Sequence, residues 1–311
     1  MKTLLYIKMG THNPNMSFGL AQVFNVVKEV DWCAYNNDMV QLNYDIKYWV
    51  NELQPDIVLM HIQKAGVISI DTLNYIASKS MVVNWTGDVR DPIPQWIIEA
   101  GQHISLTLFS NFNDVHTCQQ LGIKSDFLQV GYDTDKFTHP TPYIDFNTDI
   151  VFMGSHYKDV FPLSDLREKM VLQLKEIYGN RFKVYGSGWD KNITSGIIEN
   201  FTEECNIYHR AKIAINLSHF NYLQYSSDRL FRIMGSGAFC LSHNYLGIQK
   251  DFEPGKDLEI WNNIDELIEK IEYYLANDLE RNTIAANGNK KVASNFTWIN
   301  FAENLLKITN L

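Results

Sequence analysis

Residues 226–255, SSDRLFRIMGSGAFCLSHNYLGIQKDFEPG, decide how this chain is interpreted. Within the stretch, a short predicted helix runs through the glycine-rich turn Gly235-Ser236-Gly237 into a buried strand. A polar loop carrying Asp228 and Arg229 precedes the helix and follows an apolar strand at 213–218. Open α/β sheets bind anionic ligands at such loops, because unpaired N–H groups and the helix dipole point there. The pattern also fits an ordinary connection without a ligand.

Composition limits the class of protein. The chain has 311 residues, more than one hydrophobic core usually organises, so two domains of about 150 residues each are expected. The four cysteines lie far apart without a C-x-x-C pair, which suits a reducing compartment. The N-terminus lacks the long apolar segment of a signal peptide, and no apolar run is long enough to span a bilayer. A cytoplasmic protein is therefore predicted. The formal net charge of −9 disfavours nucleic acid and anionic membranes as partners.

The first half of the chain alternates short apolar segments with amphipathic ones. The hydrophobic pattern predicts strands over 3–9, 31–35, 56–60, 81–85, 106–110 and 125–129. It predicts helices over 17–30, 45–52 and 69–79. Strands that alternate with helices indicate a parallel sheet covered on both faces.

A linker and a second domain follow. The stretch 130–147 breaks the alternation with Gly131, Pro140 and Pro142. Further strands are predicted over 149–154, 182–186, 212–217 and 238–241. Further helices are predicted over 163–178, 206–210, 265–276, 279–294 and 298–308. The expected fold class is α/β, with doubly wound domains at 1–140 and 148–294 and a C-terminal helix in 295–311.

Four stretches carry a family pattern: GYDTDKF at 131–137, IVFMG at 150–154, YHRAKIAIN at 208–216, and the run 227–237 followed by FEPG and IDEL. Together they resemble the group-1 glycosyltransferases of the GT-B fold, in particular the spore-maturation-protein-like branch. The similarity covers about residues 130–280. Over 1–129 it is only architectural. The resemblance implies two Rossmann-like domains that face a central cleft, with the last helix crossing back onto the first domain.

The resemblance also implies a nucleoside diphosphate sugar held against the second domain. Arg229 stands where this family places a diphosphate-binding arginine, although it also fits a solvated surface residue. The implied donor site consists of Gly154, His156, Lys158, Gly186, Ser227, Asp228, Arg229, Arg232, Gly235 and Gly237. The donor is a substrate, and no further cofactor is expected.

Arg232 departs from the family pattern. Counting back five residues from Gly237 in the pattern E-x-M-x-x-G leads to Arg232, where many members carry a glutamate that binds the nucleotide ribose. An arginine cannot accept the two ribose hydroxyl protons as a carboxylate does. Either the ribose is held by another residue, the donor differs, or the site is degenerate.

The polar segment Thr86–Pro92 is the candidate acceptor site of the first domain, because it follows the end of a strand. Asp88 is a candidate general base, and it also fits a turn cap beside a local Arg90–Asp91 ion pair. His12 and His61 follow other strands, where histidines are often structural. The predicted catalytic set is Asp88, His12 and Arg229. The family branch mostly retains anomeric configuration, which favours retention here.

No metal site is predicted. Asp133 and Asp135 are spaced like metal ligands, but they do not follow a donor-site strand, and GT-B enzymes generally use positive side chains instead of a cation. Trp85, Trp96 and Trp189 are candidates for stacking on a sugar, although burial is the commoner fate of tryptophan.

The predicted function is therefore transfer of a hexosyl or pentosyl group from a nucleoside diphosphate sugar to an unidentified acceptor. The acceptor classes considered are a glycan, a small molecule, a protein and, less favoured by the charge, DNA. Three alternatives stay open: a degenerate GT-B binding protein, a glycosyltransferase that modifies DNA bases, and a sugar-nucleotide epimerase.

Overall fold

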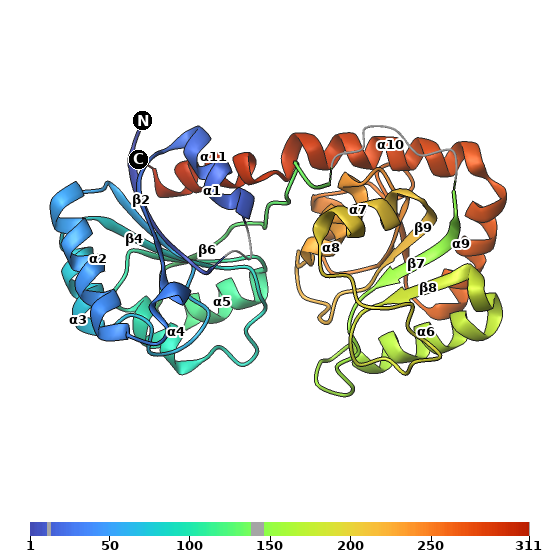
Figure 1. Cartoon of the computed structure of the whole chain (residues 1–311), viewed down its shortest axis with the longest axis horizontal. Coiled ribbons are helices and arrows are strands. Elements are labelled where there is room, and N and C mark those ends of the chain that lie inside the picture. The colour runs from blue at the N-terminus through green and yellow to red at the C-terminus, as the bar shows by residue number, and fades with distance from the viewer. Residues whose placement is uncertain (11–13, 138–145, 311) are drawn as a thin grey trace. The chain divides into compact units, whose positions relative to one another are not determined.

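The computed structural model describes residues 1–10, 14–137 and 146–310 of the chain. The chain divides into two compact units, each built on its own sheet. Unit 1 comprises Met1–Gly131 and Trp298–Leu311, and unit 2 comprises Tyr132–Thr297 (Figure 1). Every strand pair in both sheets is parallel, which confirms the predicted fold class.

Unit 1 contains a six-stranded sheet in the order β2-β1-β3-β4-β5-β6. Its strands are β1 (Thr3–Lys8), β2 (Asn25–Asp31), β3 (Ile57–Met60), β4 (Met81–Thr86), β5 (Leu106–Phe109) and β6 (Ser125–Phe127). Its helices are α1 (Pro14–Val23), α2 (Met39–Leu53), α3 (Ile70–Ala77), α4 (Gln95–Gly101), α5 (Phe112–Gln120) and α11 (Trp298–Thr309), with a 3-10 turn at Trp32–Tyr35.

Alternating strand residues supply the two faces of this sheet. Leu5 and Val58 pack on one face, in a core cluster with Leu42 of α2 and Leu73 of α3. Their neighbours along the strands, such as Leu4, lie on the opposite face and are also fully buried. Burial of both faces explains why these strands are continuously apolar.

The helix predicted over 17–30 is wrong in its second half. Helix α1 ends at Val23, and β2 occupies Asn25–Asp31, so the strand predicted over 31–35 lies too late in the sequence. Strand β2 pairs with β1 over its whole length. Pairing with β1 holds Val26 and Val30 in a β conformation, which β-branched side chains favour. The prediction of a longer helix relied only on the helical spacing of the apolar residues.

The C-terminal helix α11 belongs to unit 1 and packs along α1, as Figure 1 shows. Trp298, its first residue, is 3% exposed and contacts the rings of Trp85 and Phe301 edge-on. Gly19 and Gly131 leave room for it: a Cβ on Gly19 would lie 2.4 Å from the Trp298 carbonyl, and one on Gly131 would lie 2.8 Å from its ring. The two glycines therefore permit this close approach.

Unit 2 contains a five-stranded sheet in the order β11-β10-β9-β7-β8. Its strands are β7 (Thr148–Met153), β8 (Phe182–Tyr185), β9 (Ala211–Asn216), β10 (Cys240–His243) and β11 (Glu259–Trp261). Its helices are α6 (Ser164–Tyr178), α7 (Phe201–His209), α8 (Asp228–Gly235), α9 (Ile264–Ala276) and α10 (Asp278–Asn295), with 3-10 turns at Gly179–Arg181 and Ile248–Lys250.

The sheet of unit 2 is also covered on both faces. Phe152 and Ile215 pack in one cluster with Leu174 of α6 and Ile271 of α9. Helices α7 and α8 contact β9 on the other face, where Ala214 is fully buried. Helix α7 is longer than the predicted 206–210, because Asn200 caps its N-terminus by accepting a hydrogen bond from the Glu203 N–H.

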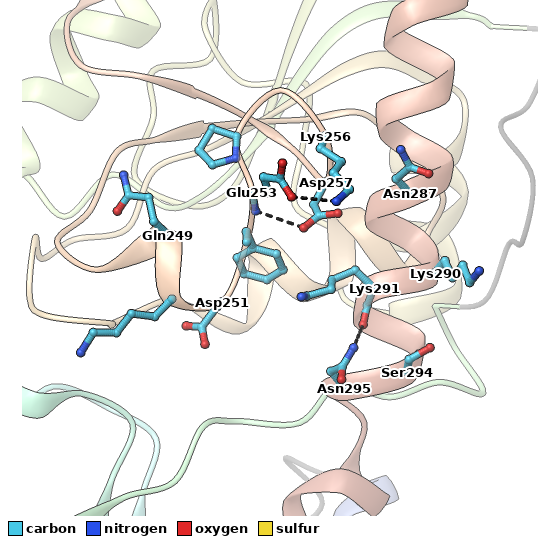
Figure 2. A pocket seen from close by; sticks show the side chains of 13 residues that line it. Gln249, Asp251, Glu253, Lys256, Asp257, Asn287, Lys290, Lys291, Ser294 and Asn295 are labelled. Carbon is cyan, nitrogen blue, oxygen red and sulfur yellow. Dashed lines mark hydrogen bonds and ion pairs between the residues drawn. The ribbon is translucent and has the colours of Figure 1, made fainter.

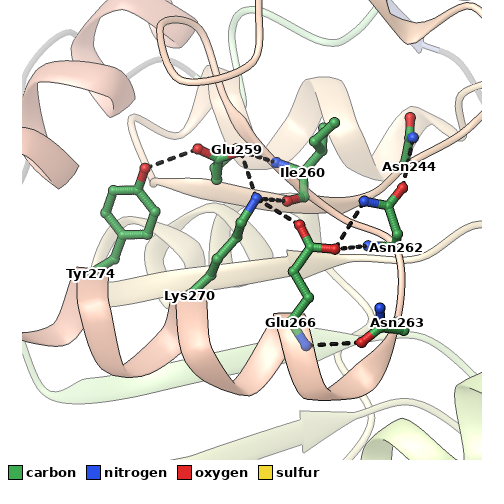
Figure 3. Close-up of polar contacts among 8 residues, drawn as sticks. All are labelled: Asn244, Glu259, Ile260, Asn262, Asn263, Glu266, Lys270 and Tyr274. Atoms are coloured by element: carbon green, nitrogen blue, oxygen red, sulfur yellow. Dashed lines mark hydrogen bonds and ion pairs between the residues drawn. The ribbon is translucent and has the colours of Figure 1, made fainter.

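A polar network fixes the outer strand β11 to α9 (Figure 3). The Lys270 ammonium donates to the Ile260 carbonyl at 2.6 Å and pairs with Glu259 at 3.2 Å and Glu266 at 2.9 Å. The Asn263 side chain caps the helix by accepting from the Glu266 N–H. Strand β11 lies at the edge of the sheet, and these contacts give its polar groups partners that a neighbouring strand would otherwise supply. We therefore assign the network a structural role.

Candidate functional site

A polar pocket of about 210 Å³ in unit 2 lies where β7 and β8 end, beside the first turn of α8. The connection from β7 runs to β8 on one side, and the connection from its other neighbour β9 runs to β10 on the opposite side. The pocket therefore lies at the switch point of the sheet, where open α/β sheets bind ligands. We call it the switch-point pocket. It is lined by Met153, Gly154, Ser155, Tyr185, Gly186, Ser187, Ile197, Ile198, Glu204, Tyr208, Asp228, Arg229 and Arg232.

Two predicted glycines form the wall at the ends of β7 and β8. Gly186 has a φ of +139°, and a Cβ on it would lie 2.6 Å from the Gly154 carbonyl oxygen. The indole N–H of Trp189 also donates to the Gly154 carbonyl, at 2.7 Å. The backbones can approach this closely only because no side chain separates them. Gly154 and Gly186 thus shape the pocket.

Helix α8 points its N-terminus at the pocket. Ser227 is the residue before the helix and makes no side-chain capping bond. Its hydroxyl lies 3.4 Å from that of Ser218, which follows β9. The N–H groups of the first helical turn therefore have no side-chain acceptor here, and with the helix dipole they favour an anion.

Two guanidinium groups lie next to each other at this end of the sheet. Arg229 donates to the Leu217 carbonyl at 3.0 Å, and Arg167 of α6 donates to the same oxygen at 2.6 Å. Both guanidinium carbons lie over the Phe152 ring, 5.6 and 5.5 Å from its centroid. Arg167 is 1% exposed, and it also donates to the Ser155 carbonyl and to Nε2 of His219.

No carboxylate pairs with either guanidinium among the described residues. Burial, followed by the nearby Arg229, lowers the pKa of Arg167 to about 8. Burial and the same two arginines lower the pKa of His219 to about 3, so this imidazole is neutral. Adjacent cations without a counter-charge are costly in a protein interior. An anion in the switch-point pocket would offset that cost.

The sequence interpretation missed Arg167, although a signal was present. Leu163, Met170, Val171 and Leu174 follow helical spacing along the buried face of α6, and Arg167 falls on the same stripe. A charged residue in an apolar stripe needs a specific partner, which makes it a candidate for a binding site.

Arg232 is neutralised from two sides. Its guanidinium pairs with Asp228 at 2.7 Å and with Glu204 of α7 at 3.5 Å, and it lies over the Phe201 ring at 4.5 Å. Burial raises the pKa of Glu204. The ion pair with Arg232 therefore holds the carboxylate of Glu204, a residue of another helix, at the pocket. Glu204 is the second residue that sequence reasoning missed, because α7 and α8 are joined by a strand and a loop.

The remaining predicted donor residues lie beside the pocket or support it. His156 stacks on Trp189 at 4.5 Å, and Lys158 is exposed; neither lines the pocket. Gly235 packs against the Tyr132 ring, where a Cβ would lie 2.5 Å from it. Gly237 has a φ of +75° and makes the turn after α8.

In unit 1 the predicted acceptor residues do not form one cluster. Asp88 is exposed and pairs with Arg90 at 3.5 Å, while the Arg90 backbone N–H donates to the buried Asp114. His61 is buried, and its ring lies 5.0 Å from that of Trp85. His12 lies outside the described residues. The roles of Asp88 and His12 stay predictions.

The residues considered for metal binding and stacking have other surroundings. Asp133 is buried, and Asp135 pairs with Lys136 at 3.5 Å. Within residues 1–10, 14–137 and 146–310, no three His, Cys, Asp or Glu side chains gather as a metal site would require. Trp85 is a core residue of unit 1, whereas Trp96 borders a cavity described below.

A larger cavity of about 670 Å³ lies between residues 249–257 and the end of α10 (Figure 2). Four lysines and three carboxylates line it. The Glu253 carboxylate pairs with Lys256 at 2.7 Å, and the Glu253 N–H donates to Asp257 at 3.1 Å. Charges of both signs therefore line this cavity, and one lysine is already paired with a carboxylate.

Asp251 in this cavity is expected to make stability depend on pH. One carboxylate oxygen accepts from Gln224 at 2.9 Å, the other is buried without a partner, and burial raises the pKa to about 6. The contribution of Asp251 to the free energy of unfolding is therefore most favourable below about pH 4, falls between pH 4 and 6, and stays lower above pH 6. Asp251→Asn should therefore gain about 1–3 kcal/mol over the wild type between pH 4 and pH 7.

Urea unfolding at pH 4, 5, 6 and 7 measures this difference. Asp159→Asn, at an exposed residue, is the matched control and should show no such gain. A gap between Asp251→Asn and the wild type that stays constant with pH would contradict the prediction.

Comparisons with known proteins support the fold independently. Residues 167–307 match a family model described as glycosyl transferase-like. HepE from Anabaena, solved with UDP-glucose, is 11% identical with a TM-score of 0.66, and each chain covers 100% of the other. A glycosyltransferase from Rickettsia africae is 13% identical (TM-score 0.67), with coverage of 99% of this chain and 97% of the other. Sucrose-phosphate synthase from Thermosynechococcus elongatus is 10% identical (TM-score 0.68), with coverage of 100% and 98%.

The two parallel-sheet units thus have the GT-B architecture of these solved structures. No curated protein gives a significant match. The spore-maturation-protein-like branch stays a prediction. Among the described residues, none of the helices has the length and apolar character needed to cross a bilayer.

Proposed function

We propose that this chain is a glycosyltransferase whose switch-point pocket binds a nucleoside diphosphate sugar, with UDP as the favoured nucleotide. The observation that carries the proposal is the pair Arg167 and Arg229, two adjacent guanidinium groups without a carboxylate partner among the described residues. The family match over residues 167–307 supports the reaction class. The complexes of HepE with UDP and UDP-glucose support the choice of nucleotide.

The chemistry of the reaction suits these groups. Breaking the bond between sugar and diphosphate places negative charge on the leaving group, and fixed cations and N–H dipoles stabilise that charge. Arg229 and the first turn of α8 would bind the diphosphate, while Arg167 supports Arg229 from behind. Because side chains supply the positive charge, we propose transfer without a metal ion. We also propose retention, with the leaving phosphate accepting the proton of the acceptor hydroxyl.

Glu204 is our candidate for the ribose-binding role that Arg232 cannot fill. A carboxylate accepts hydrogen bonds from both hydroxyls of a ribose, and Glu204 is a half-buried carboxylate that lines the pocket. The ion pair with Arg232 holds it in place and favours its charged form. We propose that Glu204 binds the ribose in the role of the glutamate that the family pattern places at position 232.

Calorimetry with UDP, GDP, ADP, CDP and dTDP tests the proposal. We expect saturable binding of UDP, and weaker binding of dTDP because it lacks the 2′-hydroxyl that Glu204 would bind. Turnover is then measured as release of UDP from UDP-sugars, and a binding protein without activity would release none. Binding of another nucleotide would correct the donor, and failure of all five to bind would overturn the proposal.

A further inference from the structure

Unit 1 contains a partly open cavity of about 230 Å³ that the predicted acceptor residues do not line. It lies between helices α3 and α4 at the carboxyl-terminal half of strands β3 and β4. This is the edge of a parallel sheet at which ligands bind. We call this cavity the Asn84 pocket.

The walls of the Asn84 pocket belong to the hydrophobic core. Met60, Ile62, Val67 and Leu73 are each at least 95% buried, and Trp96 packs against the same cluster. Walls set by a packed core are preformed, so a ligand need not order them. Water is a poor occupant of such a space, because apolar walls offer it few hydrogen-bond partners.

One polar side chain lies among these walls without a complete set of partners. Asn84 is 5% exposed, and its Oδ1 accepts a hydrogen bond from the Ile62 N–H at 3.2 Å. That bond fixes which end of the amide is oxygen, because a backbone N–H needs an acceptor. The Nδ2 donor makes no hydrogen bond within the described residues. This donor is therefore available to an oxygen of a ligand in the pocket, which Asn84 lines.

Charges of both signs lie at the border of the pocket. The Lys64 ammonium lies over the Trp32 ring at 5.2 Å, and Glu99 accepts a hydrogen bond from Gln95 at 3.2 Å. Neither sign dominates, so this border favours a ligand without net charge. The volume suits one ring, two fused rings or a short branched chain, and it is below the usual range for drug-sized ligands.

We propose that the Asn84 pocket binds the apolar end of a neutral acceptor, an aromatic or branched aliphatic alcohol, with an oxygen of that end accepting from Asn84. The reacting hydroxyl would stay at the border of the pocket. A free sugar does not fit this chemistry, because its many hydroxyls would be buried against apolar walls with one amide donor. The role as acceptor site rests on the proposed function, whereas the binding chemistry does not.

Binding of 4-methylumbelliferone, a compact aromatic alcohol with a carbonyl oxygen, tests the pocket by fluorescence titration at pH 6. Ala100→Phe places a ring in the pocket, and we expect it to weaken binding at least tenfold. Ala65→Phe makes the same change at an exposed residue outside the lining and should leave binding unchanged. Asn84→Asp keeps the acceptor for the Ile62 N–H, removes the donor, and should weaken binding about tenfold.

Circular dichroism and UDP calorimetry on each variant show whether it is folded. Saturable binding that Ala100→Phe and Asn84→Asp both weaken supports the proposal. No binding by the wild type, or undiminished binding by folded Ala100→Phe, overturns it. UDP binding is measured separately, so failure of the donor site and failure of the Asn84 pocket give different results.

The acceptor role is tested by the rate of UDP release from a UDP-sugar. If 4-methylumbelliferone accelerates this release in the wild type but not in Ala100→Phe, the acceptor role is supported. If the enzyme releases UDP but 4-methylumbelliferone does not accelerate the release, the acceptor role is overturned for this class of alcohol.

Discussion

Arg229→Ala is expected to weaken UDP binding about 100-fold, which corresponds to about 2.7 kcal/mol. The Arg229 side chain is half-buried at the switch-point pocket. Within the part of the chain that the structure describes, its guanidinium donates only to a neutral carbonyl, that of Leu217, at 3.0 Å. Hydrogen bonds to charged groups contribute about 1.5–3 kcal/mol each, and more than one with a diphosphate accounts for the expected loss. Calorimetry on the wild type and the variant measures it.

The stability of the same variant provides an independent test. Arg167 continues to donate to the Leu217 carbonyl at 2.6 Å when Arg229 is absent, so that oxygen keeps a partner. Removing Arg229 also removes a like charge that lowers the pKa of Arg167. The ligand-free Arg229→Ala protein should therefore be at least as stable as the wild type in urea unfolding. A loss of binding that comes with a loss of stability would point to a structural role instead.

Two variants complete this comparison. Arg181→Ala removes an arginine of unit 2 that pairs with Asp149 at 2.6 Å outside the pocket, and it should bind UDP like the wild type. Arg229→Lys keeps the charge but not the planar fork of donors, and we expect it to bind between the wild type and Arg229→Ala. Unchanged UDP binding by Arg229→Ala would contradict the assignment of the diphosphate to this arginine.

Trp298→Ala is expected to lower the free energy of unfolding by about 3–5 kcal/mol, the usual cost of deleting a large buried aromatic side chain. Its indole is 3% exposed and packs between Gly131 and the rings of Trp85 and Phe301. These neighbours come from segments far apart in the sequence, so they cannot easily collapse into the space. Native domains are stable by only about 5–15 kcal/mol, so this loss is large.

Trp49→Ala is the matched control for this prediction. Trp49 lies half-buried on α2, with the Lys28 ammonium 4.3 Å from its ring centroid. Truncation there leaves little enclosed space, and we expect a cost of about 1 kcal/mol. Chemical denaturation of both variants measures the two costs. Equal costs would show that α11 does not depend on Trp298 for its packing in unit 1.

Local sequence pattern was sufficient for most of the fold. Strands such as β3 and β7 are short apolar runs between turn signals, and α9 has a clear apolar stripe, so their positions could be predicted within a few residues. Pattern failed at 17–30, where pairing of β2 with β1 replaced the second half of an expected helix. A strand depends on its neighbour in the sheet, and that neighbour is not adjacent in sequence.

The sequence by itself determined the two α/β units and the polar loop before the N-terminus of α8, because hydrophobic periodicity and helix N-termini are local properties. Only the tertiary structure brought Arg167 beside Arg229 and placed Glu204 against Arg232. The same holds for the cavity beside Asn84, which α3 and α4 enclose. Each of these depends on which helices pack against the same edge of a sheet. That packing is decided by contacts between distant segments, and no local pattern records it.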